Sequence, residues 1–113
     1  QKCQKLSFLR ENPRFQEPNH SANIAITKSF RDHAKERGVS SAALSIAWLL
    51  NKSPHVVPIP GTRSVAHLKE LAFGASLSLS AEELAEIESI LPLGWAHGDR
   101  YSVSQWIGPE RYC

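Results

Sequence analysis

The chain has 113 residues, of which 42% are hydrophobic and 21% are charged, a composition typical of a soluble globular protein with one domain. Its formal charge of +2 is too small to indicate binding to nucleic acid or to an acidic membrane. The sequence has no apolar run of about 18 residues, so no membrane-spanning helix is predicted. No signal peptide is predicted in residues 1–10, and no disulfide framework from Cys3 and Cys113, which lie near opposite ends. We therefore expect a cytoplasmic protein.

A polar segment followed by an amphipathic helix is predicted at the start of the chain. Residues 1–20 are polar, contain two prolines and are predicted to form a loop. Ser21 is a suitable N-cap for a helix over residues 22–37, and Gly38 supplies a C-terminal stop. Apolar residues recur at every fourth position of this helix, which predicts one buried stripe. They are Ala22, Ile26, Phe30 and Ala34.

A buried helix and a buried strand are predicted next. Ser40 is expected to cap a helix over residues 41–51, whose nearly continuous apolar side chains indicate burial on more than one side. Residues 55–60 form an apolar run bounded by turn formers, as expected of a parallel strand covered on both faces. Pro58 counts against a central strand, because it lacks a backbone donor and suits a strand end or edge.

A single buried strand has consequences for the extent of the fold. Its backbone N–H and C=O groups need partners, and burying them unpaired costs several kcal/mol. The sequence offers no second convincing strand. We therefore expect the chain to be a portion of a larger α/β domain, or a subunit that another chain completes.

Two further helices and a tail are predicted after the strand. A turn over residues 61–64 leads into a helix that begins near Val65 and stops at Gly74. One face of this helix carries Val65, Leu68 and Ala72. Ser80 and Glu83 form a capping box for a helix over residues 80–91, which Pro92 ends. The apolar side of that helix carries Leu84, Ile87 and Leu91, and residues 92–113 are predicted to be an extended tail.

The turn after the predicted strand has the chemistry of an anion site. Gly61 precedes a hydroxyl, a guanidinium and a second hydroxyl, at the point where a helix begins. Free N–H groups and the positive end of the helix dipole favour an anion there. Thr62 and Ser64 add hydrogen-bond donors, and Arg63 can bind a phosphate through two parallel hydrogen bonds. The residues alone are equally compatible with an ordinary strand-to-helix turn that carries an exposed arginine.

The same stretch resembles a known family. Pro-Ile-Pro-Gly-Thr-Arg-Ser at residues 58–64, with Leu-Lys-Glu at 68–70, is similar to the eighth strand and cofactor loop of aldo-keto reductases. The resemblance covers about nine-tenths of the chain, in the order expected of the family. Its other carriers are residues 34–40 and 43–50 in a helical crossover over 21–54, residues 79–84 in a late helix, and residues 13–16 and 98–101 in the flanking loop and tail.

The resemblance implies an α/β fold, a TIM (β/α)8 barrel of which this chain is the C-terminal part, with one strand and about four helices. Residues 55–60 would be the last barrel strand and residues 61–74 the cofactor loop and helix. The phosphate site of such barrels commonly lies in the loops after strands seven and eight. The resemblance also implies NADP(H) as the cofactor, an aldehyde or ketone as the substrate, and barrel strands supplied by the rest of the protein or another chain.

The cofactor-binding residues carried over from the family are Gly61, Thr62, Arg63, Ser64, His67 and Glu70. In the family's arrangement, Thr62 and Arg63 would hold the adenosine 2′-phosphate, and Glu70 would reach the adenine amino group. Two positions depart from the family pattern. Leu71 stands where the family usually has asparagine, so one adenine contact is lost. His67 stands where some members have arginine, and a neutral histidine would hold the phosphate less well than a protonated one.

The resemblance implies no catalytic residue in this chain, because the family's Asp, Tyr, Lys and His come from earlier strands. Neither Tyr101 nor Tyr112 is predicted to be the general acid. Trp95 and Trp106 are compatible with a substrate-pocket wall and, equally, with core packing. The segment by itself is therefore predicted to be inactive, and the alternative reading is a truncated fragment or an interaction module without enzymatic activity.

Two other classes of function are disfavoured by the residues. Residues 22–51 have the spacing of a helix-turn-helix, but a recognition helix needs polar side chains for the bases, whereas residues 43–50 are almost all apolar. No metal site is predicted, because the five histidines and two cysteines have no paired ligand spacing.

Overall fold

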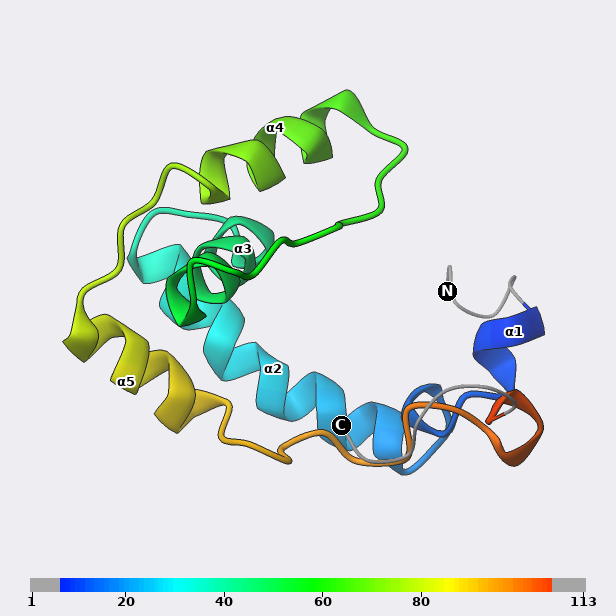
Figure 1. Ribbon diagram of the computed structural model, residues 1–113. Coiled ribbons are helices and arrows are strands. Elements are labelled where there is room, and N and C mark those ends of the chain that lie inside the picture. The colour runs from blue at the N-terminus through cyan, green and yellow to red at the C-terminus, as the bar shows by residue number, and fades with distance from the viewer. Residues whose placement is uncertain (1–6, 107–113) are drawn as a thin grey trace. The chain divides into compact units, whose positions relative to one another are not determined.

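The computed structural model describes residues 7–106, and the regular secondary structure in that range is all helical (Figure 1). It forms two units, one comprising Lys28–Pro92 and the other the segments before and after it. The α-helices are α1 (Ser7–Arg10), α2 (Asn19–Glu36), α3 (Ser41–Lys52), α4 (Val65–Gly74) and α5 (Ala81–Ile90), with 3-10 helices at Pro13–Phe15 and Val103–Gln105. None of the helices in residues 7–106 combines the length and apolarity required to span a membrane.

Polar side chains hold the tail to the N-terminal segment in the first unit. The buried Asn12 donates a hydrogen bond from Nδ2 to the carbonyl of Arg100, and Arg14 donates from Nε to the carbonyl of Gly98 at 3.2 Å. Asn23 binds the backbone of His97 twice, donating to its carbonyl at 2.9 Å and accepting from its N–H at 2.8 Å. Hydrogen bonds between side chains of the N-terminal segment and the backbone of the tail therefore position the tail in this unit.

The loop predicted over residues 1–20 is wrong within the described range, and so is the predicted N-cap. This range holds α1, a 3-10 helix and the start of α2 at Asn19, three residues before the predicted start. Residues before α2 supply acceptors for the N–H groups of its first turn: the backbone N–H of His20 donates to the carbonyl of Gln16 at 2.8 Å. The N–H of Ser21 donates to the carboxylate of Glu17 at 3.3 Å, so Glu17 takes the capping role that was assigned to Ser21.

The end of α2 and the start of α3 follow the sequence prediction. Gly38 has a φ of +74°, its N–H donates to Lys35 at 2.9 Å, and the N–H of Val39 donates to Ala34 at 3.0 Å. This pair of bonds is a Schellman motif, which needs a residue that adopts the left-handed region easily. The side chain of Ser40 accepts from the N–H of Ala43 at 3.1 Å, which confirms the predicted cap of α3.

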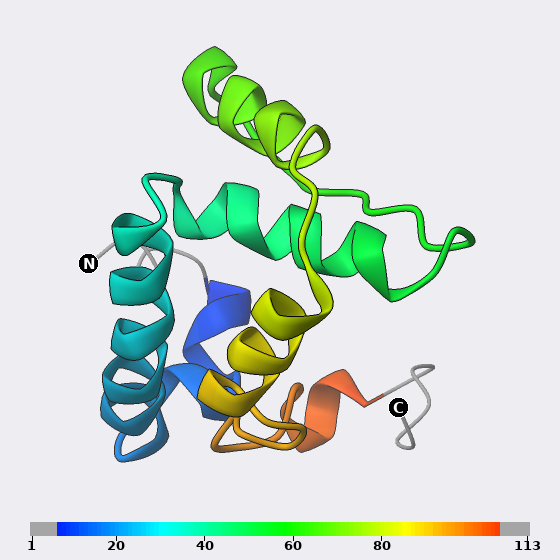
Figure 2. The same cartoon turned by 90° about the vertical axis from the view of Figure 1, so that its left-hand side faces the viewer.

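The core of the second unit lies between α2, α3 and α5. Its buried members are Phe30 and Ala34 from α2, Leu44 from α3 and Ile87 from α5. Partly buried residues pack around them, namely Val39, Trp48, Leu79, Ile90 and Leu91. Helix α3 lies between α4 and α5 in both views (Figures 1 and 2), and its residues Ala43, Leu44, Ile46 and Ala47 are buried. This confirms that α3 is covered on more than one side.

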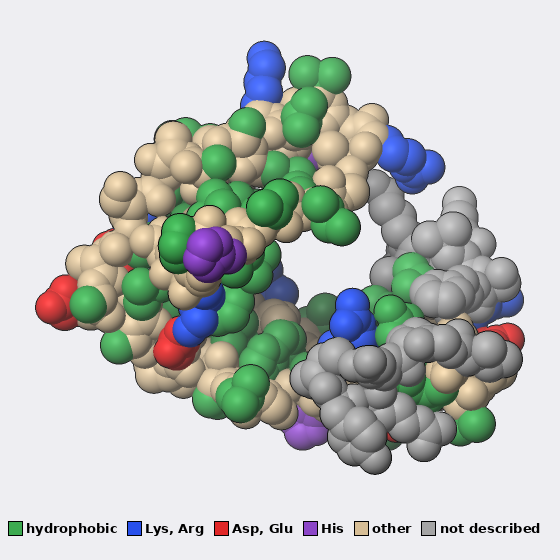
Figure 3. Space-filling model, viewed as in Figure 1, with side chains coloured by type: hydrophobic (Ala, Val, Ile, Leu, Met, Phe, Trp, Pro, Cys, Tyr) green, Lys and Arg blue, Asp and Glu red, His purple; other side chains and the backbone are tan. Residues whose placement is uncertain are grey.

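The strand predicted over residues 55–60 is absent, and no β-strand occurs within residues 7–106. Residues 56–62 have no regular secondary structure, and the side chains of Val57 and Ile59 are 80% and 93% exposed. Hydrophobic side chains accordingly show at the surface along the segment between α3 and α4 (Figure 3). The physical reason is that the N–H and C=O groups of a strand need hydrogen bonds from partner strands. Without such partners, the backbone of residues 55–60 remains in water. The prediction of a doubly covered strand is therefore wrong for this chain by itself.

Helix α4 packs against α3 through a face other than the one that carries Val65, Leu68 and Ala72. Val65, Leu68 and Ala72 are exposed, whereas Leu71 is partly buried and Gly74 is buried. The helix ends at Gly74, as predicted, although Gly74 does not have the positive φ that Gly38 has at the end of α2. A Cβ atom at Gly74 would lie 2.4 Å from the carbonyl oxygen of Ala43, so the glycine permits close approach of the two helices.

The predicted capping box of α5 is confirmed, and an ion pair extends it. The N–H of Ser80 donates to the Glu83 carboxylate at 2.7 Å, and the N–H of Glu83 donates to the Ser80 hydroxyl at 3.2 Å. The other oxygen of Glu83 accepts from Nε of Arg37 at 2.6 Å. The Ser80 backbone N–H, and after it the Arg37 side chain, hold the pKa of Glu83 below its ordinary 4.5.

We expect Glu83→Gln to lower the free energy of unfolding at pH 7 and to make stability less sensitive to acid. The lowered pKa of Glu83 means that its stabilising effect is present above about pH 4.5 and is lost as the pH falls through the folded-state pKa. Urea unfolding at pH 7 and at pH 3 measures the free energy of unfolding of both proteins. The difference between wild type and variant is expected to be smaller at pH 3. Glu36→Gln, at the exposed end of α2, is the matched control and should leave the pH profile unchanged.

Candidate functional site

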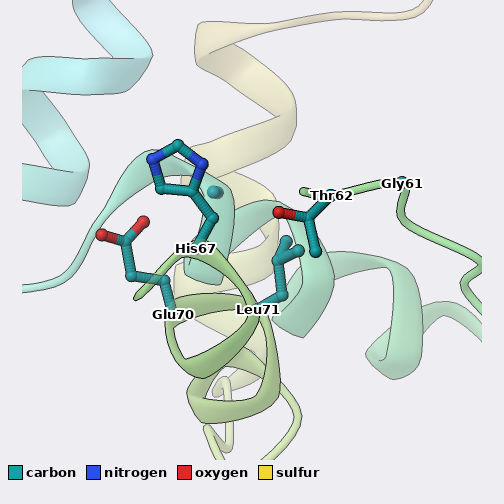
Figure 4. A pocket seen from close by; sticks show the side chains of 6 residues that line it. Gly61, Thr62, His67, Glu70 and Leu71 are labelled. Carbon is teal, nitrogen blue, oxygen red and sulfur yellow. The ribbon is translucent and has the colours of Figure 1, made fainter. Parts of the chain in front are cut away.

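A hollow of about 270 Å³ lies where the loop after residue 60 meets α3 and α4. Its lining comes from three pieces of the second unit: the loop, the first turn of α3 and the inner face of α4. The lining residues are Ala42, Gly61, Thr62, His67, Glu70 and Leu71. Figure 4 shows the side chains of His67 and Glu70 rising from neighbouring turns of α4, with Thr62 across from them on the loop.

The loop before α4 is shaped by short hydrogen bonds between its hydroxyls and its own backbone. The Thr62 hydroxyl accepts from the N–H of Ser64 at 3.2 Å and lies 3.3 Å from the Ser64 carbonyl oxygen, to which it donates. The Ser64 hydroxyl accepts from the N–H of His67 at 3.4 Å and caps α4. These bonds fix the start of α4. They use the O–H of Thr62 as a donor, whereas the Ser64 hydroxyl only accepts and keeps its O–H for an anion.

The groups that remain for an anion at this helix start are a guanidinium, the Ser64 O–H and backbone donors. Arg63 is exposed, and within residues 7–106 its side chain makes no hydrogen bond or ion pair. In the same range, the N–H groups of Val65 and Ala66 have no acceptor, as expected for the first turn of a helix. This donor set, together with the positive end of the helix dipole, suits a phosphate group.

The structure gathers four of the six predicted cofactor residues around the hollow. These are Gly61, Thr62, His67 and Glu70. Arg63 and Ser64 belong to the same loop but do not line the hollow, and the Ser64 hydroxyl caps the helix. The predicted turn at 61–64 and the helix that begins at Val65 are both confirmed.

Two lining residues were not among the predicted binding residues. Leu71 lies four positions after His67, so it shares the helix face of His67, and this spacing is readable in the sequence. Ala42 comes from the first turn of α3 and reaches the hollow because α4 packs on α3. No signal in the sequence identifies that contact. With Ala42 and Leu71 the hollow gains an apolar wall.

The aromatic residues of the tail belong to the other unit. Tyr101 and Trp106 stack edge to face with ring centroids 5.3 Å apart, and Trp95 is partly buried. None of the three lines the hollow, so the choice between a pocket wall and core packing stays untested. Tyr112 lies outside the described residues, as do Cys3 and Cys113. Within residues 7–106, no group of three or more potential metal ligands comes together.

Comparison with known proteins assigns the chain to a family. Residues 3–92 match the sequence model of the Aldo/keto reductase family. The chain belongs to this family. The resemblance drawn from residues 58–70 and the flanking motifs is thereby confirmed. This family has a TIM barrel fold and generally binds a nicotinamide cofactor.

Two curated relatives to which this family member is similar are longer proteins. It is similar to a probable aldo-keto reductase 1 of Glycine max, with 36% identity over 84% of this chain and 28% of the relative. It is also similar to the norsolorinic acid reductase stcV of Emericella nidulans, with 33% identity over 75% of this chain and 22% of the relative. The chain thus spans about a quarter of the length of these aldo-keto reductases. No solved structure matches it significantly.

Proposed function

We propose that this chain is the C-terminal part of the barrel of an NADP(H)-dependent aldo-keto reductase that reduces aldehydes or ketones to alcohols. The chain would supply the part of the cofactor site that binds the adenosine end, in which Arg63 binds the 2′-phosphate. The observation that carries the proposal is the hollow at the start of α4, which four residues of the family-like cofactor loop and helix line. The family assignment supports the reductase activity, and so does the similarity to a norsolorinic acid reductase of Emericella nidulans.

The donor set fits the proposed ligand. A 2′-phosphate is an exposed dianion, and the Arg63 guanidinium can bind two of its oxygens while the N–H groups of Val65 and Ala66 bind a third. The carboxylate of Glu70 is an acceptor on the rim of the hollow, as an adenine amino group requires, and Leu71 offers an apolar surface to the flat base. The bound cofactor supplies the hydride, and this chain's residues bind and orient its distal end.

We infer that residues 55–60 form the last barrel strand once the remaining strands are present. Val57 and Ile59 are exposed here and have the side chains of a strand that is covered on both faces. Pairing with neighbours would satisfy the backbone and bury these side chains together. The four catalytic residues of the family would come from those missing strands, so this chain by itself is expected to show no reductase activity.

The test is Arg63→Ala in the complete natural protein. Losing a charged, two-pronged hydrogen bond to the phosphate is expected to raise the dissociation constant of NADPH by about tenfold or more. NADH lacks the 2′-phosphate, so its affinity should change little. Equilibrium fluorescence titration with each cofactor measures both values.

The matched control for this test is Lys69→Ala. Lys69 is an exposed cation in the middle of α4, beyond the first turn whose N–H groups are free, so its loss removes the same charge without removing a phosphate ligand. A general electrostatic effect would weaken NADPH binding in both variants. Equal weakening of NADPH and NADH by Arg63→Ala would contradict the assignment of this residue to the 2′-phosphate.

A second candidate function is that of a fragment that acts only by interaction. The observation in its favour is a set of exposed apolar side chains on the loop and on α4, whose members are Val57, Ile59, Val65, Leu68 and Phe73. Exposed apolar surface of this kind marks interaction sites as well as incomplete folds. Light scattering and thermal melting of the 113-residue chain discriminate between a free-standing interaction module and a portion of a larger barrel. A monodisperse monomer with a sharp thermal transition would indicate an independent domain.

A further inference from the structure

Gly74 brings the end of α4 onto the backbone of α3. It is buried, and a Cβ atom at this position would lie 2.4 Å from the carbonyl oxygen of Ala43 and 3.0 Å from its carbonyl carbon. The chain on either side of α4, at residues 56–62 and 77–80, has no regular secondary structure that would hold the helix at another distance. The spacing of the two helices at this point therefore depends on the absence of a side chain at residue 74.

The same two helices supply the apolar lining of the hollow. Ala42, the chain neighbour of Ala43, lines the hollow from α3. Leu71 lies one turn before Gly74 on the same face of α4 and lines the hollow from that helix (Figure 4). Each lining residue is thus within one turn of a residue in the close contact. Any change in the spacing of the helices at Gly74 therefore changes the width of the hollow.

We propose that Gly74 is a positioning residue for the cofactor, because it holds α4 against α3 and so sets the width of the hollow that receives the adenine base. This rests on the proposed function and adds a residue outside the cofactor loop that controls the same site. Gly74 is buried between the helices, so it acts on the base through α3 and α4 and not by contact. NADPH and NADH have the same base, so the width of the hollow affects the binding of both.

The test is Gly74→Ala in the complete natural protein, with the dissociation constants of NADPH and NADH measured by equilibrium fluorescence titration. Relieving the overlap with Ala43 requires the helices to separate by about 1 Å, and a gap of that size removes about a quarter to a half of the dispersion attraction across it. We expect both dissociation constants to rise by a similar factor, about threefold to tenfold. Arg63→Ala, in contrast, is expected to raise the dissociation constant of NADPH alone.

The matched control is Gly38→Ala at the end of α2. A Cβ atom there meets no atom within 4 Å, but the φ of +74° makes alanine unfavourable, so the variant loses stability without moving α4. Its dissociation constants for both cofactors should equal those of the wild type. A rise in this variant as large as that in Gly74→Ala would show that lost stability, and not the width of the hollow, weakens binding.

A second variant, Ala42→Val, adds two carbon atoms to the wall of the hollow. In the wild type these atoms narrow the hollow and should raise both dissociation constants. In Gly74→Ala they fill the extra width and should lower the constants towards those of the wild type. A general loss of structure would not reverse the sign of the effect between the two backgrounds.

The outcomes separate this inference from the proposed function. Unchanged dissociation constants in Gly74→Ala, or an effect of Ala42→Val that has the same sign in both backgrounds, would overturn the role of Gly74. If circular dichroism shows that Gly74→Ala does not fold, Ala42→Val in the wild type decides, and unchanged constants there would overturn it. The proposed function fails on a different result, an unchanged preference for NADPH in Arg63→Ala.

Discussion

Leu44→Ala is expected to lower the free energy of unfolding by about 3 kcal/mol, within the range found for buried leucines. Leu44 is 0% exposed and lies in the core cluster with Phe30, Ala34 and Ile87, so it joins α3 to both α2 and α5. Its truncation removes apolar contacts and leaves a cavity that helices held by caps at fixed positions fill only in part. Urea unfolding followed by circular dichroism measures the loss, with an unchanged slope as the sign that only stability has changed.

The matched control is Leu93→Ala, because the side chain of Leu93 is fully exposed. The same three carbon atoms are removed there, yet no cavity forms, and the change in stability should stay within about 0.5 kcal/mol. Leu44→Met keeps most of the buried volume and is expected to cost less than about 1.5 kcal/mol. A loss below about 1 kcal/mol for Leu44→Ala would show that the cluster is not a packed core.

Elements defined by local chemistry could be predicted from the sequence. The Ser40 cap, the Gly38 stop and the capping box of Ser80 with Glu83 each involve residues within a few positions of one another, and all three are confirmed. The same holds for the turn and helix start at residues 61–65, which is why four of the predicted cofactor residues come together. Their role in binding a cofactor stays a prediction.

Features that depend on distant partners could not be read in this way. The strand over residues 55–60 carries the right side chains, but strand formation requires backbone partners that this chain lacks. The start of α2 was misplaced because Glu17, outside the expected helix, accepts the hydrogen bond of Ser21. The packing face of α4 could not be read from apolarity, because Val65 is exposed and α3 contacts the helix through Gly74, the smallest residue.

Gly74→Ala is expected to lower the free energy of unfolding by about 2–3 kcal/mol, because Gly74 is where α4 approaches α3 most closely. A Cβ atom at residue 74 would lie 2.4 Å from the carbonyl oxygen and 2.9 Å from the Cα of Ala43. Both atoms belong to the backbone of α3, so no side-chain rotation relieves the overlap and the two helices must separate. Alanine favours the helical conformation over glycine by about 1 kcal/mol, and this gain offsets only part of the cost.

Substitutions at two other glycines serve as controls, because they distinguish the effect of steric overlap from the effect of backbone conformation. Gly61→Ala meets no atom within 4 Å and has no positive φ, so its unfolding free energy should stay close to that of the wild type. Gly38→Ala also has open space, but its φ of +74° should cost about 1 kcal/mol through conformational strain alone. If Gly74→Ala were as stable as Gly61→Ala in urea, α4 would not pack closely on α3. The hollow between them, and the cofactor site proposed there, would then lose the wall that Ala42 provides.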